Sequence, residues 1–196
     1  MSEKPGNGLD PALRQHSHCS FCGAAYERLL WPRVCARCGN ITWRNPLPVA
    51  VLAVPVLHDG RVGVVTIRRN IEPKRGLLAL PGGFMEVDES WQQSCVRELL
   101  EESGVQVDAA HVMLHAVHSS PSGNLVVFGR APLLRAADLP PFAGNSEASG
   151  REILFVPTEL AFPLHTLVLT QMLELYANQH AAHNESDPAY LVSGAE

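Results

Sequence analysis

No run of apolar residues in this 196-residue chain approaches the roughly 20 residues that a membrane-spanning helix needs. The chain has no internal repeat of useful period and no helix-turn-helix pattern. Its opening residues, MSEKPGNGLD, lack the apolar core of a secretory signal. These absences argue against a membrane protein, a repeat array and a secreted disulfide scaffold. We therefore expect a cytoplasmic protein with no membrane partner.

The composition is that of a globular protein, and its charge is unevenly distributed. Hydrophobic residues make up 46% of the chain, and the mean hydropathy is +0.01. Residues 1–48 carry six Lys/Arg against three Asp/Glu, whereas the remainder carries nine against seventeen. The length suits one medium domain and one small, basic module. Such a module could guide an anionic substrate. A nucleic acid is not the partner that we expect.

Cysteine is scarce, yet four of the five cysteines fall into two Cys-x-x-Cys pairs: Cys19 with Cys22, and Cys35 with Cys38. Four thiolates at this spacing can close a tetrahedral zinc site, and a closed site holds structure instead of performing chemistry. Two disulfides or a redox pair are the alternatives, and the missing secretory signal disfavours the disulfides. Cys95 stands alone and is expected to be a small core residue.

Negative charge is concentrated in one short segment that follows the glycine pair Gly82-Gly83. Five glutamates fall within seventeen positions: Glu86, Glu89, Glu98, Glu101 and Glu102. We predict a helix over residues 90–103, with Asp88 near its N-cap and Gly104 at its C-terminal stop. Like charges at i,i+3 and i,i+4 destabilise a helix, so the cluster calls for a positive partner or a metal.

The helical spacing predicts how these carboxylates are arranged. At roughly 100° per residue, Glu98, Glu101 and Glu102 share one face, and Val96, Leu99 and Leu100 are expected to face the core. Hard oxygen ligands on one face suit Mg²⁺ or Mn²⁺, which usually also bind phosphate oxygens. The alternative is a solvated acidic helix face. The glycine pair fits a loop whose backbone approaches a metal or a phosphate.

The whole segment from Gly83 to Val105 resembles the Nudix box, Gly-x5-Glu-x7-Arg-Glu-U-x-Glu-Glu-x-Gly-U, where U is aliphatic. All nine specified positions match: Gly83, Glu89, Arg97, Glu98, Leu99, Glu101, Glu102, Gly104 and Val105. The resemblance implies a loop–helix–loop that binds divalent metal. It implies that Glu98, Glu101 and Glu102 are the main metal ligands, completed by a main-chain carbonyl near Gly82.

The same resemblance implies roles for the residues around the ligands. Arg97 is expected to orient Glu89 by a charge-assisted hydrogen bond. Metal-assisted hydrolysis of a pyrophosphate needs a general base to accept a proton from water. Glu98, Glu147 in the loop before a late strand, and Glu152 are the candidates for this base. Glu86 remains either a ligand or a solvent-exposed loop acid.

Four cations before the box are candidate ligands for the diphosphate of a substrate: Arg68, Arg69, Lys74 and Arg75. The alternative is that they form a solvated charged surface beside a strand. Their position, in the run RRNIEPKRGLLALPGGFME, is similar to that in compact ribbon-Nudix hydrolases, which include plant plastid FAD pyrophosphatases. The resemblance therefore places them near the substrate.

The predicted fold class is α/β, a Nudix-type α/β/α sandwich with a mixed sheet between helices, preceded by a small zinc ribbon. In addition to the helix at 90–103, we expect strands at 49–57 (interrupted by Pro55), 62–67, 77–80, 111–118, 124–130 and 153–156. We also expect a loop over 132–150 and a helix at 164–177. The expected division is a flexible N-terminus (1–17), a zinc ribbon (18–45), a Nudix hydrolase domain (46–178) and a disordered tail (179–196).

These residues predict hydrolysis of the pyrophosphate bond in a nucleoside diphosphate linked to a second group, as in FAD or ADP-ribose. NADH pyrophosphatases carry a Ser-Gln-Pro-Trp-Pro-Phe-Pro segment shortly after the box, and the corresponding residues 118–124 lack its aromatic residues. An NADH or NAD-capped-RNA pyrophosphatase is therefore an alternative. A further alternative is a non-catalytic nucleotide sensor whose ribbon binds DNA or protein. A homodimer is possible in either case.

Overall fold

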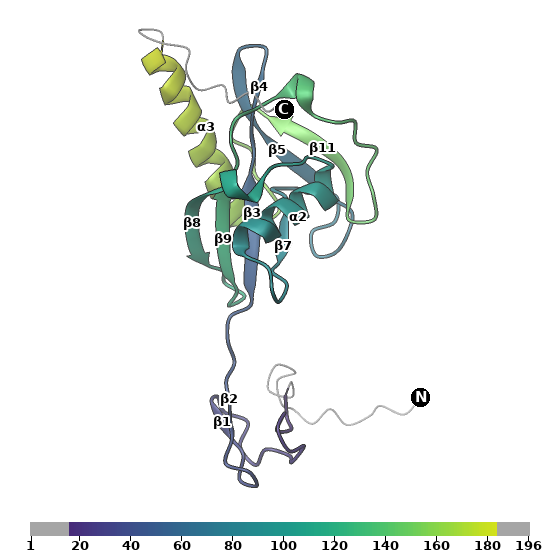
Figure 1. Ribbon diagram of the computed structural model, residues 1–196, viewed down its shortest axis with the longest axis vertical. Helices are drawn as coiled ribbons and strands as arrows, with labels where there is room; N and C mark the ends of the chain where they lie inside the picture. The colour runs from purple at the N-terminus through teal and green to yellow at the C-terminus, as the bar shows by residue number, and fades with distance from the viewer. Residues whose placement is uncertain (1–15, 184–196) are drawn as a thin grey trace. The chain divides into compact units, whose positions relative to one another are not determined.

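The structure, a computed structural model, describes residues 16–183, with side chains of the last helix described as far as Asn178. The expected tails therefore lie largely outside the described residues. By its internal contacts the chain divides into two compact units, Met1–Pro46 and Leu47–Glu196. In the first unit, β1 (Arg33–Val34) and β2 (Ile41–Thr42) form an antiparallel pair (Figure 1). The zinc-ribbon and hydrolase labels given to these ranges remain predictions.

The second unit contains two long helices and a series of mostly short strands. Its elements are, in chain order, β3 (Pro48–Ala53), β4 (Pro55–His58), β5 (Arg61–Arg69), β6 (Leu78–Ala79), β7 (Gly82–Phe84), α2 (Trp91–Ser103), β8 (Met113–Ser119), β9 (Leu125–Arg130), β10 (Leu134–Arg135), β11 (Ala148–Leu154) and α3 (Pro163–His183). Short 3-10 turns lie at Ala109–His111 and Ala136–Asp138. Neither long helix, as far as it is described, is long and apolar enough to cross a membrane.

The strands form two mixed sheets. One has the order β10-β4-β5-β11, with β6 also pairing with β5, and the other has the order β7-β3-β9-β8. The pairs β3–β9 and β10–β4 are parallel, and the remaining pairs are antiparallel. The chain passes from one sheet to the other at Val54, between β3 and β4. The predicted strand 49–57 is therefore broken at Val54, and Pro55 begins the next strand.

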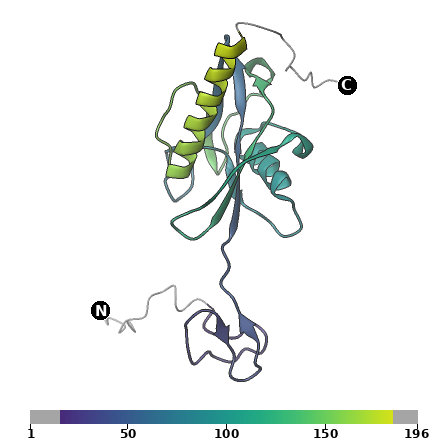
Figure 2. The same cartoon turned by 90° about the vertical axis from the view of Figure 1, so that its left-hand side faces the viewer.

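Strand β3 supplies both hydrophobic cores, because its alternate side chains point to opposite faces. Val51 and Ala53 pack with α3 residues such as Val168 and Met172. The alternate residues Ala50, Leu52 and Val54 pack with Cys95 and Leu99 of α2. The two helices thus cover opposite sides of the strands, as Figure 2 shows. The predicted α/β/α sandwich and the core position of Cys95 are confirmed.

Most element boundaries differ from the predictions by one or two residues, the short strand β7 was not predicted, and three differences are larger. The late strand β11 begins at Ala148 instead of 153, because it pairs with β5 from Arg69 to Val64. Part of the predicted loop 132–150 is ordered as β10, which pairs with β4. Helix α3 continues to His183, so residues 179–183 are helical and do not belong to a disordered tail. Pairing and helix continuation depend on neighbours that local sequence signals do not reveal.

Candidate active site

Helix α2 carries three of the five clustered glutamates (Glu98, Glu101 and Glu102), and both of its ends are capped. Ser90 is the N-cap: its side chain accepts a hydrogen bond from Gln93 N, and the Gln93 side chain accepts one from Ser90 N. This reciprocal pair is a capping box. Asp88, expected near the cap, lies two residues earlier with φ 74°. Gly104 ends the helix at φ 73°, as predicted.

The buried face of α2 includes two of the glutamates and leaves out Leu100, contrary to the expectation that Val96, Leu99 and Leu100 form it. Glu98 and Glu102 are buried beside Leu99, at 7%, 3% and 0% exposure. Leu100, which we expected in the core, is 48% exposed. The reason is that the helix packs against β7 as well as β3, so the buried arc extends over the carboxylates. Helical spacing alone does not say which part of the helix the sheet covers.

Glycines in β7 make this burial possible. A Cβ atom at Gly83 would lie 2.6 Å from Glu98 Cδ, and one at Gly82 would lie 2.6 Å from Val51 Cα. Both distances are too short for a real side chain. At Gly82 the neighbour is backbone, so this position requires glycine, whereas a side chain at Gly83 would displace the Glu98 carboxylate. The Gly82 amide donates to Glu102 Oε2 at 2.9 Å. The glycine pair therefore allows two carboxylates to lie directly against a strand backbone.

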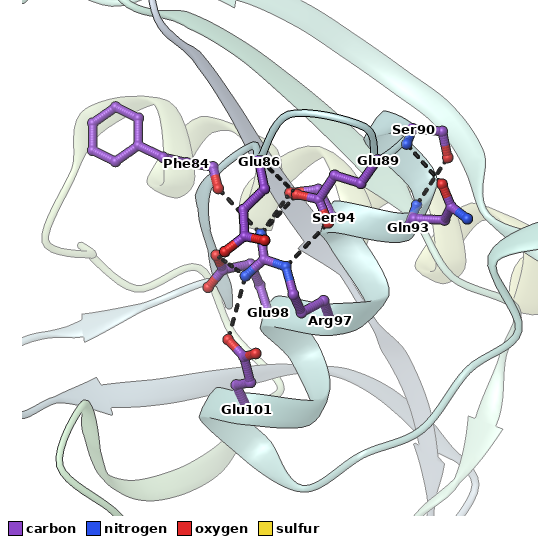
Figure 3. Close-up of polar contacts among 9 residues, drawn as sticks. All are labelled: Phe84, Glu86, Glu89, Ser90, Gln93, Ser94, Arg97, Glu98 and Glu101. Atoms are coloured by element: carbon purple, nitrogen blue, oxygen red, sulfur yellow. Dashed lines mark hydrogen bonds and ion pairs between the residues drawn. The ribbon is translucent and has the colours of Figure 1, made fainter.

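Arg97 is surrounded by acceptors from the helix and the preceding loop (Figure 3). Its guanidinium donates to Glu89 Oε1 (2.8 Å), Glu89 Oε2 (3.1 Å), Glu98 Oε1 (2.8 Å), Glu101 Oε2 (3.3 Å), Ser94 Oγ (3.2 Å) and the Phe84 carbonyl (3.1 Å). The fork to Glu89 is the bidentate arrangement for which arginine is suited. The Glu86 amide donates to Glu89 Oε1 at 2.7 Å.

The charges around Arg97 set the protonation of Glu89. The hydrogen bonds from Arg97 lower the pKa of Glu89 to about 2, despite partial burial. The same bonds raise the pKa of Arg97 above its usual value. Glu89 is therefore an anion at neutral pH, and it serves as the ion-pair partner of Arg97.

Glu98 and Glu102 are shifted in the opposite direction. Burial raises the pKa of Glu102 to about 7, with Glu98 and Glu147 adding like charge, while the Gly82 amide and Arg69 lower it. Burial also raises the pKa of Glu98, against the effect of Arg97. Buried acids whose pKa values rise are characteristic of functional sites, because the fold pays for unfavourable charge there.

Glu101 lies at the edge of the site, with its side chain 52% exposed and bonded to Arg97. The three glutamates thus come from one stretch of helix, but their oxygens are not drawn together. Among the described residues, the cysteines form the one group of at least three His, Cys, Asp or Glu ligand atoms within 4.8 Å of one another. In the carboxylate site, Arg97 takes up oxygen atoms of both Glu98 and Glu101.

The three candidate bases have different surroundings. Glu98 is buried at the centre of the site. Glu147 is exposed immediately before β11, and its charge contributes to the raised pKa values of Glu98 and Glu102. Glu152 forms an ion pair with Arg68, Nη2 to Oε1. Glu98 and Glu147 therefore share one electrostatic environment, whereas Glu152 is engaged elsewhere.

The four candidate phosphate cations are also not equivalent. The Arg69 charge lowers the pKa of Glu102, and its guanidinium lies over the Phe162 ring at 5.2 Å. Arg68, the preceding strand residue, bonds to Glu152 and to the Gly76 carbonyl. Arg75 donates to Asn70 Oδ1 at 3.0 Å, and Lys74 is exposed in the turn with φ 67°. Arg69 is thus the cation that the fold connects to the carboxylates.

The four paired cysteines converge in the first unit. Their Sγ atoms all lie within 4.8 Å of one another, with Cys19 to Cys38 and Cys22 to Cys35 both at 3.6 Å. Sulfur ligands at the vertices of a tetrahedral zinc site are separated by roughly 3.8 Å, given Zn–S bonds of about 2.3 Å. A disulfide would require about 2.05 Å. The arrangement therefore fits a four-thiolate metal site, not two disulfides.

Sequence reasoning missed the contacts of Asn70 and Asn145, which join the Glu147 loop to the end of β5 and to α2. A signal was present in Gly144-Asn145, because asparagine in a turn often accepts hydrogen bonds from amides two and three residues later. Nothing local, however, indicates the donor bond to a distant helix.

Comparison with known proteins supports the resemblance of residues 83–105 to the Nudix box. Residues 46–169 match the NUDIX domain family. The NAD-capped RNA hydrolases NudC of Salmonella typhi and of Enterobacter sp. (strain 638) are both 27% identical over 106 residues, which is 52% of this chain and 39% of each relative. The chain thus spans about two-fifths of the length of these relatives.

Solved structures extend the likeness to the fold. A NUDIX hydrolase from Nitrosomonas europaea aligns with a TM-score of 0.63 and 26% identity, covering 89% of this chain and 96% of that one. Shewanella oneidensis NrtR aligns with a TM-score of 0.54 and 23% identity over 69% of this chain and 64% of its own. At that identity the second likeness concerns the fold alone.

Proposed function

Because this chain belongs to the NUDIX family, we propose that it is a metal-dependent hydrolase of the pyrophosphate bond in a nucleoside diphosphate linked to a second group, such as FAD or ADP-ribose. The observation that carries this proposal is the burial of Glu98 and Glu102 against the glycine strand, with pKa values raised by burial and like charge. A fold maintains such unfavourable carboxylates where they bind a cation.

The donor chemistry fits Mg²⁺ or Mn²⁺. Glu98, Glu101 and Glu102 offer hard carboxylate oxygens from one helix, and the backbone near Gly82 lies beside Glu102. When bound, such an ion offsets charge on phosphate oxygens and lowers the pKa of a bound water. In the proposal these three glutamates and the Gly82 carbonyl hold it. Glu98 and Glu101 would then exchange a bond to Arg97 for a bond to metal.

The remaining residues orient the ligands and move the proton. Arg97, fixed by Glu89, sets the position of Glu98. Glu147 accepts the proton of the attacking water in this proposal, because it is exposed and lies near the buried acids. Glu98 is the other candidate, and the ion pair with Arg68 disfavours Glu152.

Substrate phosphates are proposed to contact Arg69 first among the four cations. Its charge reaches Glu102, whereas Arg68 is bonded to Glu152 and Arg75 to Asn70. Lys74 and Arg75, in the neighbouring turn, would contact more distant parts of a dinucleotide. A diphosphate between these cations and a metal would have both of its charges offset.

The first unit is proposed to hold a structural Zn²⁺ through Cys19, Cys22, Cys35 and Cys38. The sulfur separations given above support this ion. Closed four-cysteine sites leave no position for a substrate, so the chemistry is assigned to the second unit alone. Metal-binding thiols are typical of a reducing compartment such as the cytoplasm.

An NAD-type dinucleotide, free or at the end of an RNA, is the second candidate substrate. It is favoured by the NudC relatives, which are NAD-capped RNA hydrolases. Residues 118–124 of this chain, His-Ser-Ser-Pro-Ser-Gly-Asn, lack the tryptophan and phenylalanine that NADH pyrophosphatases carry in this segment. FAD and ADP-ribose therefore remain the preferred class.

The test is hydrolysis of FAD, ADP-ribose, NADH, NAD-capped RNA and nucleoside triphosphates, with and without Mg²⁺ or Mn²⁺. We expect metal-dependent release of a nucleoside monophosphate from FAD or ADP-ribose. Glu98→Gln is expected to lower kcat by about 10³-fold or more while the fold survives, since the change removes charge without changing shape. Absence of metal-dependent product from every substrate would refute the proposal.

A further inference from the structure

Asn145 connects three segments around the candidate site. Its Oδ1 accepts from the amides of Glu147 (2.9 Å) and Ala148 (2.8 Å) within its own loop. Its Nδ2 donates to the Glu101 carbonyl, in the last turn of α2, at 2.5 Å. Because both loop partners are donors and the helix partner is an acceptor, the side-chain amide has one orientation that satisfies all three.

Asn70, the residue after β5, holds the same loop from the other side. Its main-chain N–H donates to the Glu147 carbonyl at 2.7 Å, and its side-chain Nδ2 donates to the Asn145 carbonyl at 3.1 Å. Its Oδ1 accepts from Arg75 Nη2 at 3.0 Å. The main chain of Glu147 is therefore bonded at both its N–H and its C=O, whereas its side chain is exposed.

A second connection fixes the same loop to the same helix end. Arg151 of β11 donates to the Ser103 carbonyl at 2.7 Å and to the Pro140 carbonyl at 2.5 Å. The loop between Pro140 and Ala148 thus meets the C-terminal turn of α2 at two places. That turn contains Glu101 and Glu102, two of the proposed metal ligands.

We propose that Asn145 is a positioning residue, which bonds the Glu147 backbone to the ligand helix and thereby fixes where the Glu147 carboxylate stands relative to that helix. The inference rests on the proposed function, in which Glu147 takes the proton from water. A general base acts through its geometry, and a displacement of about 1 Å can cost 10²-fold in rate. Asn145 itself touches no substrate.

Two substitutions separate the local turn from the connection to the helix. Serine at 145 retains a side-chain oxygen that can accept from the amides two and three residues later, but it has no amide to reach Glu101. Alanine loses both contacts. Neither change adds a charge beside the metal ligands, as aspartate would.

The decisive measurement is a double-mutant cycle between Asn145→Ser and Glu147→Gln, using ADP-ribose or FAD with saturating Mg²⁺. We expect Asn145→Ser to lower kcat by about tenfold with KM changed less than about threefold, and Glu147→Gln to lower kcat by about 100-fold. In the Glu147→Gln background, Asn145→Ser should cost less than about twofold. Equal losses in both backgrounds would show a general structural role and overturn the inference, as would normal kcat in either single variant.

Hydrogen exchange tests the connection without any activity. In Asn145→Ser, amide exchange over residues 145–148 and in the last turn of α2 should accelerate by about tenfold, while the first turn of α2 is unchanged. Unchanged exchange in both segments would overturn the inference even if the enzyme is active. If the wild-type protein hydrolyses no substrate, the proposed function fails, and with it the catalytic part of this inference. Amide hydrogen exchange then tests separately whether Asn145 connects its loop to α2.

A matched control uses Asn178→Ser, which makes the same chemical change at an exposed position of α3. It should leave kcat, KM and the exchange of residues 145–148 unchanged. The melting temperature of Asn145→Ser should stay within about 3 °C of that of the control, as is usual for surface substitutions. A larger fall would mean that the lost activity reflects unfolding, and would overturn the positioning role.

Discussion

The cysteine cluster and the glutamate cluster are both candidate metal sites, yet they are built in opposite ways. Four thiols from two short turns have ligand atoms within 4.8 Å of one another, in a unit with little other core. The glutamates are supported by a large sandwich, and Arg97 stands among them. A small unit needs its metal for folding, whereas a large one can hold carboxylates in place for an ion that must also accept substrate.

The largest expected effect is a loss of folding when the cysteine cluster is changed. Cys35→Ser, at a position only 2% exposed, should abolish zinc binding and unfold residues 16–46, because binding energy on the order of 10 kcal/mol is also folding energy there. Zinc content and NMR spectra of the full chain measure both changes. The melting transition of the second unit should persist.

Cys95→Ala is the control, because Cys95 lies in the core of the other unit. It should keep one zinc per chain. If Cys35→Ser left the first unit folded, the contrast between the two sites would be lost.

In the glutamate cluster, the second largest expected effect is a dependence of the stability of the second unit on pH. The pKa of Glu102 rises to about 7 in the fold, from an ordinary value of 4.5. The folded state thus binds the proton more tightly, so this contribution is complete below about pH 4.5 and is lost as the pH rises toward 7, by about 3 kcal/mol in all. Glu102→Gln should remove this loss.

This loss of stability is measured by denaturant unfolding of the second unit between pH 5 and 8. The protein is first dialysed against buffer free of Mg²⁺ and Mn²⁺. Dialysis without chelator leaves a tight zinc site loaded. Added Mn²⁺ should restore stability at pH 8 in the wild type but less in Glu102→Gln. Burial lowers the pKa of His165 to about 3, so this group adds stability as the pH rises in both variants, and only the difference between wild type and Glu102→Gln isolates Glu102. A difference that is flat over this range would contradict the pKa assignment.

Arg97→Lys tests whether the arginine sets geometry or merely supplies charge. Lysine retains the charge but cannot make the fork to both Glu89 oxygens, so we expect kcat to fall by about 100-fold with a smaller change in KM. The pKa of Glu89 should rise toward its usual value, as measured by carbon-13 NMR. Full activity of Arg97→Lys would reduce its role to charge compensation.

The smallest effect distinguishes two neighbouring cations. Arg69→Ala should raise KM by about tenfold, because this charge reaches Glu102, whereas Arg68→Ala should raise it by less than about twofold. Steady-state kinetics on the same substrate compares them directly. Equal effects would mean that the ion pair with Glu152 does not keep Arg68 from binding the substrate phosphates.

Local signals predicted the parts of this molecule that depend on near neighbours. The helix stop at Gly104 and the convergence of the paired cysteines follow from backbone freedom and spacing over a few residues. The boundaries of β11 and α3 could not be predicted in this way, because strand pairing and helix packing set them.

The sequence by itself determined the chemistry available: nine matching positions of the box, three glutamates on one helix and four cysteines at zinc spacing. Only the tertiary structure decided how these groups are used. Packing of α2 on the glycine strand buried Glu98 and Glu102 and exposed Leu100, and pairing of β11 with β5 placed Glu147 where its charge acts on both buried acids. Residue types and spacing are local properties, whereas burial, and with it the pKa of a carboxylate, depends on distant segments that cover it.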